Sequence, residues 1–161
     1  MNEQESAAWL GLVTVCQLLP VALDSQLQRD SDMTHFEFLV LSVLKFAPDR
    51  TERMSDLART TNATLPRLSH VCSRLEKRGL VERAASPADR RATDVRLTSA
   101  GNRALVQAMR GHLETARHLV VDALTPEQLD QLAGITDSIR ERLTGAAECD
   151  RFADADGAPI R

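Results

Sequence analysis

The helical spacing of apolar residues is interrupted at one place along this chain, and that interruption limits the folds the chain can adopt. Nearly everywhere, apolar side chains recur at steps of three and four residues, which is typical of amphipathic helices. Between Leu80 and Thr98 there are two short extended runs instead, and in the second run apolar Val95 and Leu97 lie on either side of polar Arg96, as in a half-buried strand. Only 3% of the residues are aromatic, so the core must be built from aliphatic side chains, which favours packed helices over a β-sandwich. The sequence therefore predicts a mainly α fold with one small β-hairpin.

Long amphipathic helices are expected at both ends of the chain. The first covers about residues 6–30, has an apolar stripe from Trp9 to Leu27, and should be interrupted and kinked at Pro20. The last two cover about residues 99–145. These helices are too apolar to be covered by one small domain, so we expect a second copy of the chain to cover them.

Between the terminal helices the sequence predicts a helix-turn-helix followed by the hairpin. A capping box at Thr34–Glu37 begins one helix, and a short helix follows at Met54–Ala58. After a turn at residues 60–63, a longer helix runs from a Thr64 cap to Arg78 and stops at Gly79. The apolar residues of this longer helix share one side, so its other side faces outwards.

The outward side of that helix has the small, polar and basic side chains that a base-reading helix needs. Arg offers two donors to guanine, Ser and His can bond a base edge or a phosphate, and the helix N-terminus favours a phosphate. The residues expected to contact DNA there are Thr64, Pro66, Arg67, Ser69, His70, Ser73 and Arg74. The alternative is an ordinary solvated helix face.

The hairpin loop places Asp89, Arg90 and Arg91 side by side. An Arg on a narrow loop can enter the minor groove of DNA, where the negative potential is strongest. A carboxylate is repelled there, so we expect Asp89 to orient one of the two arginines through a charge-assisted hydrogen bond. Residues 50–103 contain twelve Lys and Arg against six Asp and Glu, although the whole chain has a net charge of −3. This concentration of positive charge is typical of a phosphate-backbone binder.

Together these motifs resemble the MarR family of winged-helix transcription regulators. The resemblance covers about residues 9–143, and its most specific parts are the loop at Asp89–Arg91 and the segment Val95–Gly101 that follows it. It implies a homodimer joined by the terminal helices, with two winged helix-turn-helix lobes that bind double-stranded DNA. It also implies repression of a nearby promoter and release by a small phenolic or other amphipathic ligand.

The resemblance also assigns roles within the lobe. It implies that residues 64–74 match the recognition helix and that Arg91 is the wing-tip arginine, steadied by Asp89. The family usually has a polar pair where this chain has Leu65-Pro66, so fewer base hydrogen bonds are expected at the start of the helix. No residue of an effector site can be named from the sequence.

We expect one MarR-type domain over residues 1–147. Its winged lobe covers about residues 34–98, and its dimerisation helices cover about 6–30 and 99–145. Residues 148–161 lack apolar periodicity, which predicts a disordered tail.

Enzyme, metal and membrane functions have little support in the sequence. No phosphate-binding glycine loop, zinc-protease motif or nucleophile elbow is found, so we expect no catalytic residue, cofactor or metal site. The N-terminus is acidic, unlike a secretory signal, and we expect no membrane-spanning segment. Three widely spaced cysteines indicate a reducing compartment, and hence the cytoplasm.

Two other functions stay open. Cys16 lies near the place where peroxide sensors of the resembled family keep a reactive cysteine, so a thiol-based repressor is one alternative. Those sensors use tyrosines to lower the pKa of the thiol, and this chain has no Tyr, which favours a buried structural thiol. The other alternative is a dimeric interaction module that does not bind DNA.

Overall fold

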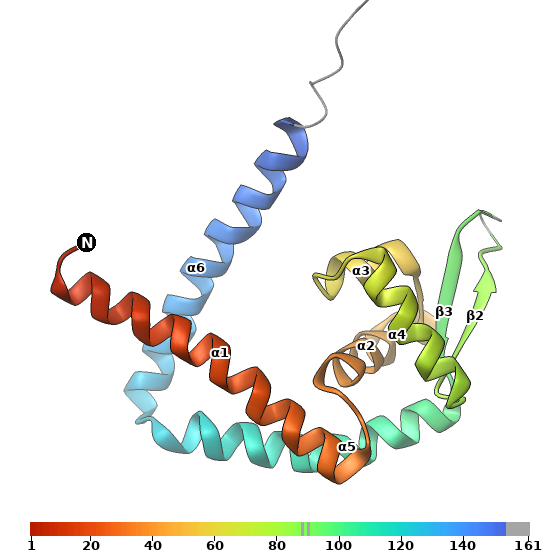
Figure 1. Cartoon of the computed structure of the whole chain (residues 1–161), viewed down its shortest axis with the longest axis horizontal. Coiled ribbons are helices and arrows are strands. Elements are labelled where there is room, and N and C mark those ends of the chain that lie inside the picture. The colour runs from red at the N-terminus through yellow and green to blue at the C-terminus, as the bar shows by residue number, and fades with distance from the viewer. Residues whose placement is uncertain (88, 90, 154–161) are drawn as a thin grey trace, which may run out of the picture. The chain divides into compact units, whose positions relative to one another are not determined.

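The computed structural model of the chain describes residues 1–87, 89 and 91–153. In chain order its elements are α1 (Glu3–Ser31), α2 (His35–Phe46), η1 (Pro48–Arg50), β1 (Thr51–Arg53), α3 (Met54–Thr60), α4 (Leu65–Lys77), β2 (Val81–Ala85), β3 (Thr93–Leu97), α5 (Ser99–Leu119), η2 (Val121–Ala123) and α6 (Pro126–Ala153), as Figure 1 shows. The mainly α fold is confirmed. The chain divides into two compact units, Met1–Ala116 and Arg117–Arg161. A single domain over residues 1–147 stays a prediction.

Local capping signals begin and end the helices of the lobe where the sequence predicts. The Glu37 carboxylate accepts from the Thr34 backbone N–H at 2.9 Å, and the Thr34 hydroxyl accepts from the Glu37 N–H at 3.1 Å. This capping box begins α2. Thr64 caps α4, and Gly79 follows that helix with a positive φ of 69°, a conformation that glycine adopts without steric cost.

The sheet has one strand more than the predicted hairpin. Its order is β1-β3-β2 and both pairings are antiparallel, so β3 is the central strand. Thr51–Arg53 form the additional strand, with Glu52 opposite Val95. A strand of three polar residues has no apolar alternation, which is why the sequence pattern did not predict it.

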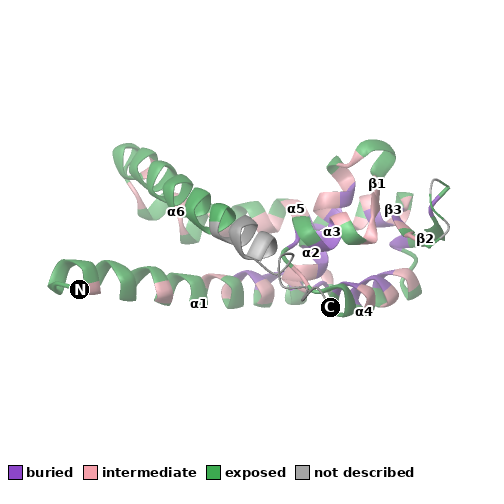
Figure 2. Cartoon of the chain, turned by 90° about the horizontal axis from the view of Figure 1, so that it is seen from above, coloured by how far each residue is buried: buried purple, intermediate pink, exposed green. Residues whose placement is uncertain are grey.

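The core of the first unit lies among α2, α3, α4, α5, the sheet and the C-terminal end of α1 (Figure 2). Its largest fully buried side chains are Leu27, Met33, Leu41, Leu44, Leu57, Leu68, Leu75, Leu105, Val40, Val81, Val95 and Cys72. As expected from the composition, the core is aliphatic. It holds α4 against the sheet, and so fixes which side of α4 faces outwards.

α1 differs from its prediction in two ways. It is one continuous helix from Glu3 to Ser31 with Pro20 inside it, so the expected interruption at the proline is wrong. As expected for a helix that one copy cannot cover, only the C-terminal part of its apolar stripe is buried and Trp9 is exposed, but Cys16 is exposed in the single chain as well. The expectation that Cys16 is buried is therefore wrong for one copy alone.

The expected absence of a membrane-spanning segment is not confirmed either. By length and composition alone, α1 could cross a membrane, since its most apolar window of 18 residues has a mean hydropathy of 1.8. This is weak evidence, because helices that pack in soluble proteins pass the same test.

In the second unit, α6 begins at a capping box. Thr125 and Gln128 exchange hydrogen bonds of 2.9 and 3.3 Å between backbone and side chain, and Pro126 occupies the first helical position. The helix continues to Ala153, so it includes the start of the segment expected as a tail, residues 148–161. The rest of that segment lies outside the described residues.

The end of α4, the sheet and the start of α5 pack closely together around Thr98 and Gly101. The Thr98 hydroxyl donates to the Gly79 carbonyl at 2.7 Å and accepts from the Gly101 N–H at 2.9 Å. The Thr98 N–H donates to the Leu80 carbonyl at 3.1 Å. Gly101 is buried here, and a Cβ on it would lie 2.0 Å from the Leu80 oxygen, so the close approach requires glycine.

Candidate nucleic-acid interface

One face of α4 packs into the core and the opposite face is accessible to solvent. Leu68, Val71, Cys72 and Leu75 are buried. Burial raises the pKa of the Cys72 thiol to about 11, as expected for a core cysteine. At 3.6 residues per turn, the opposite face presents Pro66, His70, Ser73 and Lys77, of which Ser73 is half-buried and the others exposed. The solvent-facing side predicted from the sequence is thus confirmed.

The flank of α4 toward α2 is held by a buried carboxylate. Glu37 is only 4% exposed, and its Oε1 accepts from the Arg74 Nη2 at 3.0 Å. The Arg78 Nη1 lies 3.7 Å from the Glu37 Oε2. Arg74, which the sequence predicts as a DNA contact, is therefore engaged with α2 in the free chain.

A second arginine on this flank also has a partner on α2. The Arg67 guanidinium carbon lies 4.3 Å from the centre of the Phe36 ring, a cation–π contact. Arg67 is exposed and Phe36 is half-buried, so the ring fixes the direction of a side chain that solvent still reaches. Two neighbouring residues of α2 thus hold two arginines of α4.

The other flank of α4 is tied to the sheet by Glu76. Its Oε2 accepts from the Arg83 Nη2 at 2.6 Å and from the Arg83 Nε at 2.9 Å, and its Oε1 accepts from the Arg83 backbone N–H at 3.1 Å. These hydrogen bonds lower the pKa of the Glu76 carboxyl and keep it ionised. Arg83 lies on β2, so these bonds join α4 to the strand that precedes the loop between β2 and β3. This loop, residues 86–92, is the wing loop.

In the wing loop, Asp89 acts on the backbone. Its Oδ1 accepts from the Arg91 backbone N–H at 3.0 Å, which leaves the exposed Arg91 guanidinium free of Asp89 among the described contacts. The Ala92 N–H donates to the Asp89 carbonyl at 2.8 Å and closes the turn. The expected charge-assisted bond from Asp89 is thus made to the Arg91 N–H and not to its side chain. Arg90 lies outside the described residues.

The remaining predicted contact residues lie on α4 or at its start. The Thr64 hydroxyl accepts from the Arg67 N–H at 3.4 Å as the helix cap, and Ser69 is half-buried. Sequence analysis placed Glu37 only in a capping box. A stronger signal was present, because Glu37 lies on the same side of its helix as Val40, Leu41 and Leu44, and a carboxylate on a buried face requires a partner.

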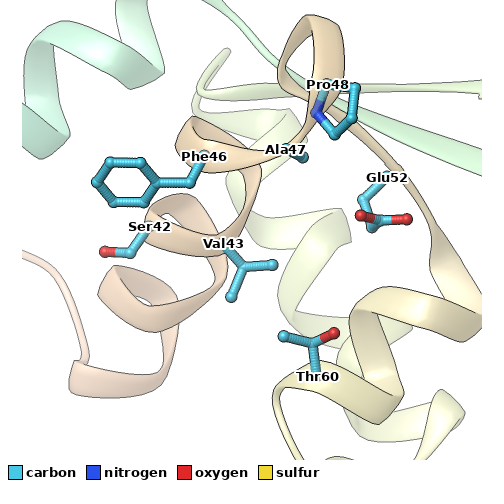
Figure 3. A pocket seen from close by; sticks show the side chains of 7 residues that line it. All are labelled: Ser42, Val43, Phe46, Ala47, Pro48, Glu52 and Thr60. Carbon is cyan, nitrogen blue, oxygen red and sulfur yellow. The ribbon is translucent and has the colours of Figure 1, made fainter.

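An open pocket of about 460 Å³ lies between α2, β1 and α3. Its lining residues are Ser42, Val43, Phe46, Ala47, Pro48, Glu52 and Thr60, which Figure 3 shows around the hollow. Glu52 is the charged member of this lining, so the pocket suits a neutral or cationic apolar molecule better than a carboxylate. Among the described residues no cluster of His, Cys, Asp and Glu could hold a metal ion.

Comparisons with known proteins agree with this geometry. A family model described as MarR family matches residues 31–92. The structure is similar to the crystal structure of Sco3205, a MarR family transcriptional regulator from Streptomyces coelicolor in complex with DNA. That likeness has a TM-score of 0.84 and 38% identity, over 89% of this chain and 93% of that one.

Two further relatives are also described as transcriptional regulators. AbsC, a MarR family transcriptional regulator from Streptomyces coelicolor, is 32% identical with a TM-score of 0.84, over 90% of this chain and 97% of that one. The Bacillus subtilis protein YdcH, described as an uncharacterized helix-turn-helix transcriptional regulator, is 31% identical over 80 residues. That match covers 48% of this chain and spans 54% of the relative, about half of its length.

Proposed function

Because the chain belongs to the MarR family of transcriptional regulators, we propose that it binds a near-palindromic double-stranded DNA site as a homodimer. Each copy would insert α4 into the major groove and the loop between β2 and β3 into the adjacent minor groove. The proposed contact set is the one expected from the sequence: Thr64, Pro66, Arg67, Ser69, His70, Ser73, Arg74, Arg90 and Arg91, with Asp89 shaping the loop.

The open face of α4 is the observation that carries this proposal. Its central side chains, Pro66, His70, Ser73 and Lys77, are small, polar or basic, and the core and both ion-paired flanks leave them outermost. A helix that is fixed on both sides and presents such a face meets the geometric requirement for reading base edges. The relative Sco3205, whose structure contains DNA, supports the same assignment.

The proposed homodimer rests on apolar side chains that one copy leaves exposed. On α1 these are Trp9, Leu10, Leu12, Val15, Leu18 and Val21, and on α6 they are Leu132, Ile135, Ile139 and Leu143. Exposed apolar surface on such a scale is typical of an interface rather than of a monomer. A two-fold dimer would place its recognition helices roughly 34 Å apart, one turn of DNA, and so require a near-palindromic site.

Selection from random duplex DNA tests the proposal directly. We expect the full chain to enrich a near-palindromic sequence, with half-sites about one helical turn apart. Failure to enrich any duplex at low ionic strength would refute DNA binding and favour the interaction module.

The wing can be tested on the selected site. We expect Arg91→Ala to weaken specific binding by about 1–3 kcal/mol, measured by fluorescence anisotropy. Arg110→Ala is the matched control, because Arg110 is an exposed arginine of α5 paired with Glu114, outside the proposed surface. Equal affinities of Arg91→Ala and the parent would remove the wing from the proposal.

We also propose that binding represses a promoter in the cytoplasm and is released by a small amphipathic or phenolic ligand. A promoter–reporter strain with and without the regulator tests repression, and addition of candidate ligands to the protein–DNA complex tests release. Higher reporter output in the presence of the regulator would identify an activator instead.

One observation favours a second candidate, a thiol-based sensor. Cys16 is exposed in the single chain, so an oxidant could reach it before the dimer forms or when it opens. Loss of DNA binding with hydroperoxide in the parent, but not in Cys16→Ser, would establish this function. Equal sensitivity of the two proteins would exclude a role for Cys16.

A further inference from the structure

Glu37 is unusual among the described residues because it is a charged side chain in the core of the first unit. It is 4% exposed, and no other Asp, Glu, Lys or Arg among the described residues is classed as buried. Its two oxygens are used in different ways. Oε2 accepts from the Thr34 backbone N–H and so caps α2, while Oε1 accepts from the Arg74 guanidinium of α4.

Because it is buried, the Glu37 carboxylate needs its hydrogen-bonded and charged partners to stay in place. An isolated buried carboxylate is strongly unfavourable, and removing one partner of a buried ion pair is costly. Arg78, with its Nη1 3.7 Å from the Glu37 Oε2, also lies 3.9 Å from Asp32, which is fully exposed. Arg74 is the closer cation at 3.0 Å, and about half of its side chain remains exposed.

The consequence for α4 concerns its orientation. Arg74 lies at the edge of the outward face, one helical turn from His70 and two from Arg67. Glu37 draws the guanidinium of Arg74 toward α2, away from the middle of that face, and Phe36 does the same for Arg67 through its ring. The small and polar side chains are then left as the outermost groups along the helix.

We propose that Glu37 is a positioning residue for DNA recognition: it holds Arg74 off the phosphate backbone and fixes α4 against α2 so that the middle of the helix meets the bases. The inference rests on the DNA-binding function proposed above. Freed from Glu37, Arg74 would add a phosphate contact that carries no sequence information. Glu37 therefore favours specific over non-specific binding.

The test is Glu37→Gln, which removes the charge and keeps an acceptor for the helix cap, because Gln also serves at this position of a capping box. Binding is measured against salt concentration on the selected site and on an unrelated duplex. We expect non-specific binding to strengthen, and its logarithmic salt slope to steepen by about 0.9 for one additional phosphate contact. The ratio of specific to non-specific affinity should fall roughly tenfold, in line with about 1.4 kcal/mol.

A matched control separates this effect from a change in net charge. Glu114→Gln removes one carboxylate from an exposed pair with Arg110 on α5, and we expect no change in salt slope or specificity. If Glu114→Gln steepens the slope as much as Glu37→Gln does, general electrostatics explains the result and the proposal is overturned.

Arg74→Ala, made in both backgrounds, gives a readout that a purely structural role would not produce. In the parent we expect Arg74→Ala to lower the specificity ratio, because it removes a residue of the proposed contact set at the edge of the base-reading face. We expect the salt slope to stay the same, because Glu37 already keeps the Arg74 guanidinium off the phosphates. In Glu37→Gln we expect Arg74→Ala to return the slope to the parental value. If Arg74→Ala makes the salt slope of the parent shallower by about 0.9, Arg74 already contacts a phosphate and the proposal is overturned.

Two checks distinguish an effect of Glu37→Gln on folding from an effect on DNA recognition. Circular dichroism and thermal melting show whether Glu37→Gln is folded, and if it is not, the Arg74→Ala slope in the parent decides alone. If the parent protein binds no duplex, the DNA-binding proposal fails, and this inference fails with it. If the parent binds but Glu37→Gln leaves slope and specificity unchanged, only the role of Glu37 is refuted.

Discussion

Replacing Gly101 by alanine tests the junction at the start of α5. The added Cβ would lie 2.0 Å from the Leu80 carbonyl oxygen, 2.8 Å from the Leu97 Cδ1 and 2.9 Å from the Leu80 carbonyl carbon. Optimal separations are about 3.5–4.0 Å, so the helix has to move by roughly 1.5 Å. Two of these atoms belong to the backbone, so a change of side-chain rotamer cannot relieve the contact.

The magnitude follows from three contributions. Overpacking of this kind costs about 1–3 kcal/mol, and displacing α5 weakens the Thr98 hydrogen bonds, which contribute about 1 kcal/mol each. Alanine is favoured over glycine within a helix by about 0.8–1.0 kcal/mol, which offsets part of the loss. We expect Gly101→Ala to lower the free energy of unfolding by about 2–4 kcal/mol.

Thermal unfolding followed by circular dichroism measures this loss. For a chain of this length we expect the Tm to fall by roughly 5–15 °C, at a protein concentration matched to the parent because a dimer melts in a concentration-dependent way. Gly134→Ala is the control, since a Cβ at this α6 position meets nothing within 4 Å and should stabilise the helix by up to about 1 kcal/mol. A Tm of Gly101→Ala equal to or above that of the parent would refute the close approach.

Three other predictions concern pH, thiol reactivity and assembly. Burial, and secondarily the charge of His35, lower the pKa of His112 in the folded chain. As the pH falls below about 6.5, His112 is therefore protonated in the unfolded chain before it is protonated in the folded chain. The free energy of unfolding should therefore fall as the pH is lowered through that range. It should fall less in His112→Gln, as measured by urea titration. Cys72, whose pKa is about 11, should resist alkylation at pH 8 until denaturant is added, which mass spectrometry of its peptide can show. Ile135→Asp should shift a dimer to monomers in sedimentation velocity, and an unchanged species would exclude this part of α6 from the interface.

Features that depend on neighbours in the sequence were predicted well. The caps at Thr34 and Thr64 and the left-handed Gly79 each depend on residues within a few positions, so their signals are complete in a short segment. The alternation of Val95 and Leu97 likewise predicted β3, because one face of that strand is buried.

Features that depend on distant pairing were missed or only partly predicted. β1 was missed because its polar residues form a strand only through pairing with β3. The Glu37–Arg74 pair joins residues 37 positions apart, and no local pattern indicates which cation a buried carboxylate meets. Exposure of Cys16 in the single chain was missed for a related reason, since periodicity shows that a helix has an apolar face but not whether the same chain covers it.

The central place of β3 has a consequence for how such regulators can diversify. Val95 is held opposite Arg83 of β2 and also opposite Glu52 of β1, so its inward orientation does not depend on the turn that joins β2 to β3. Insertions or deletions in that turn can therefore accumulate without turning the apolar side of the strand toward water. The reach of the loop becomes a trait that mutation can lengthen or shorten while the scaffold beneath it stays the same.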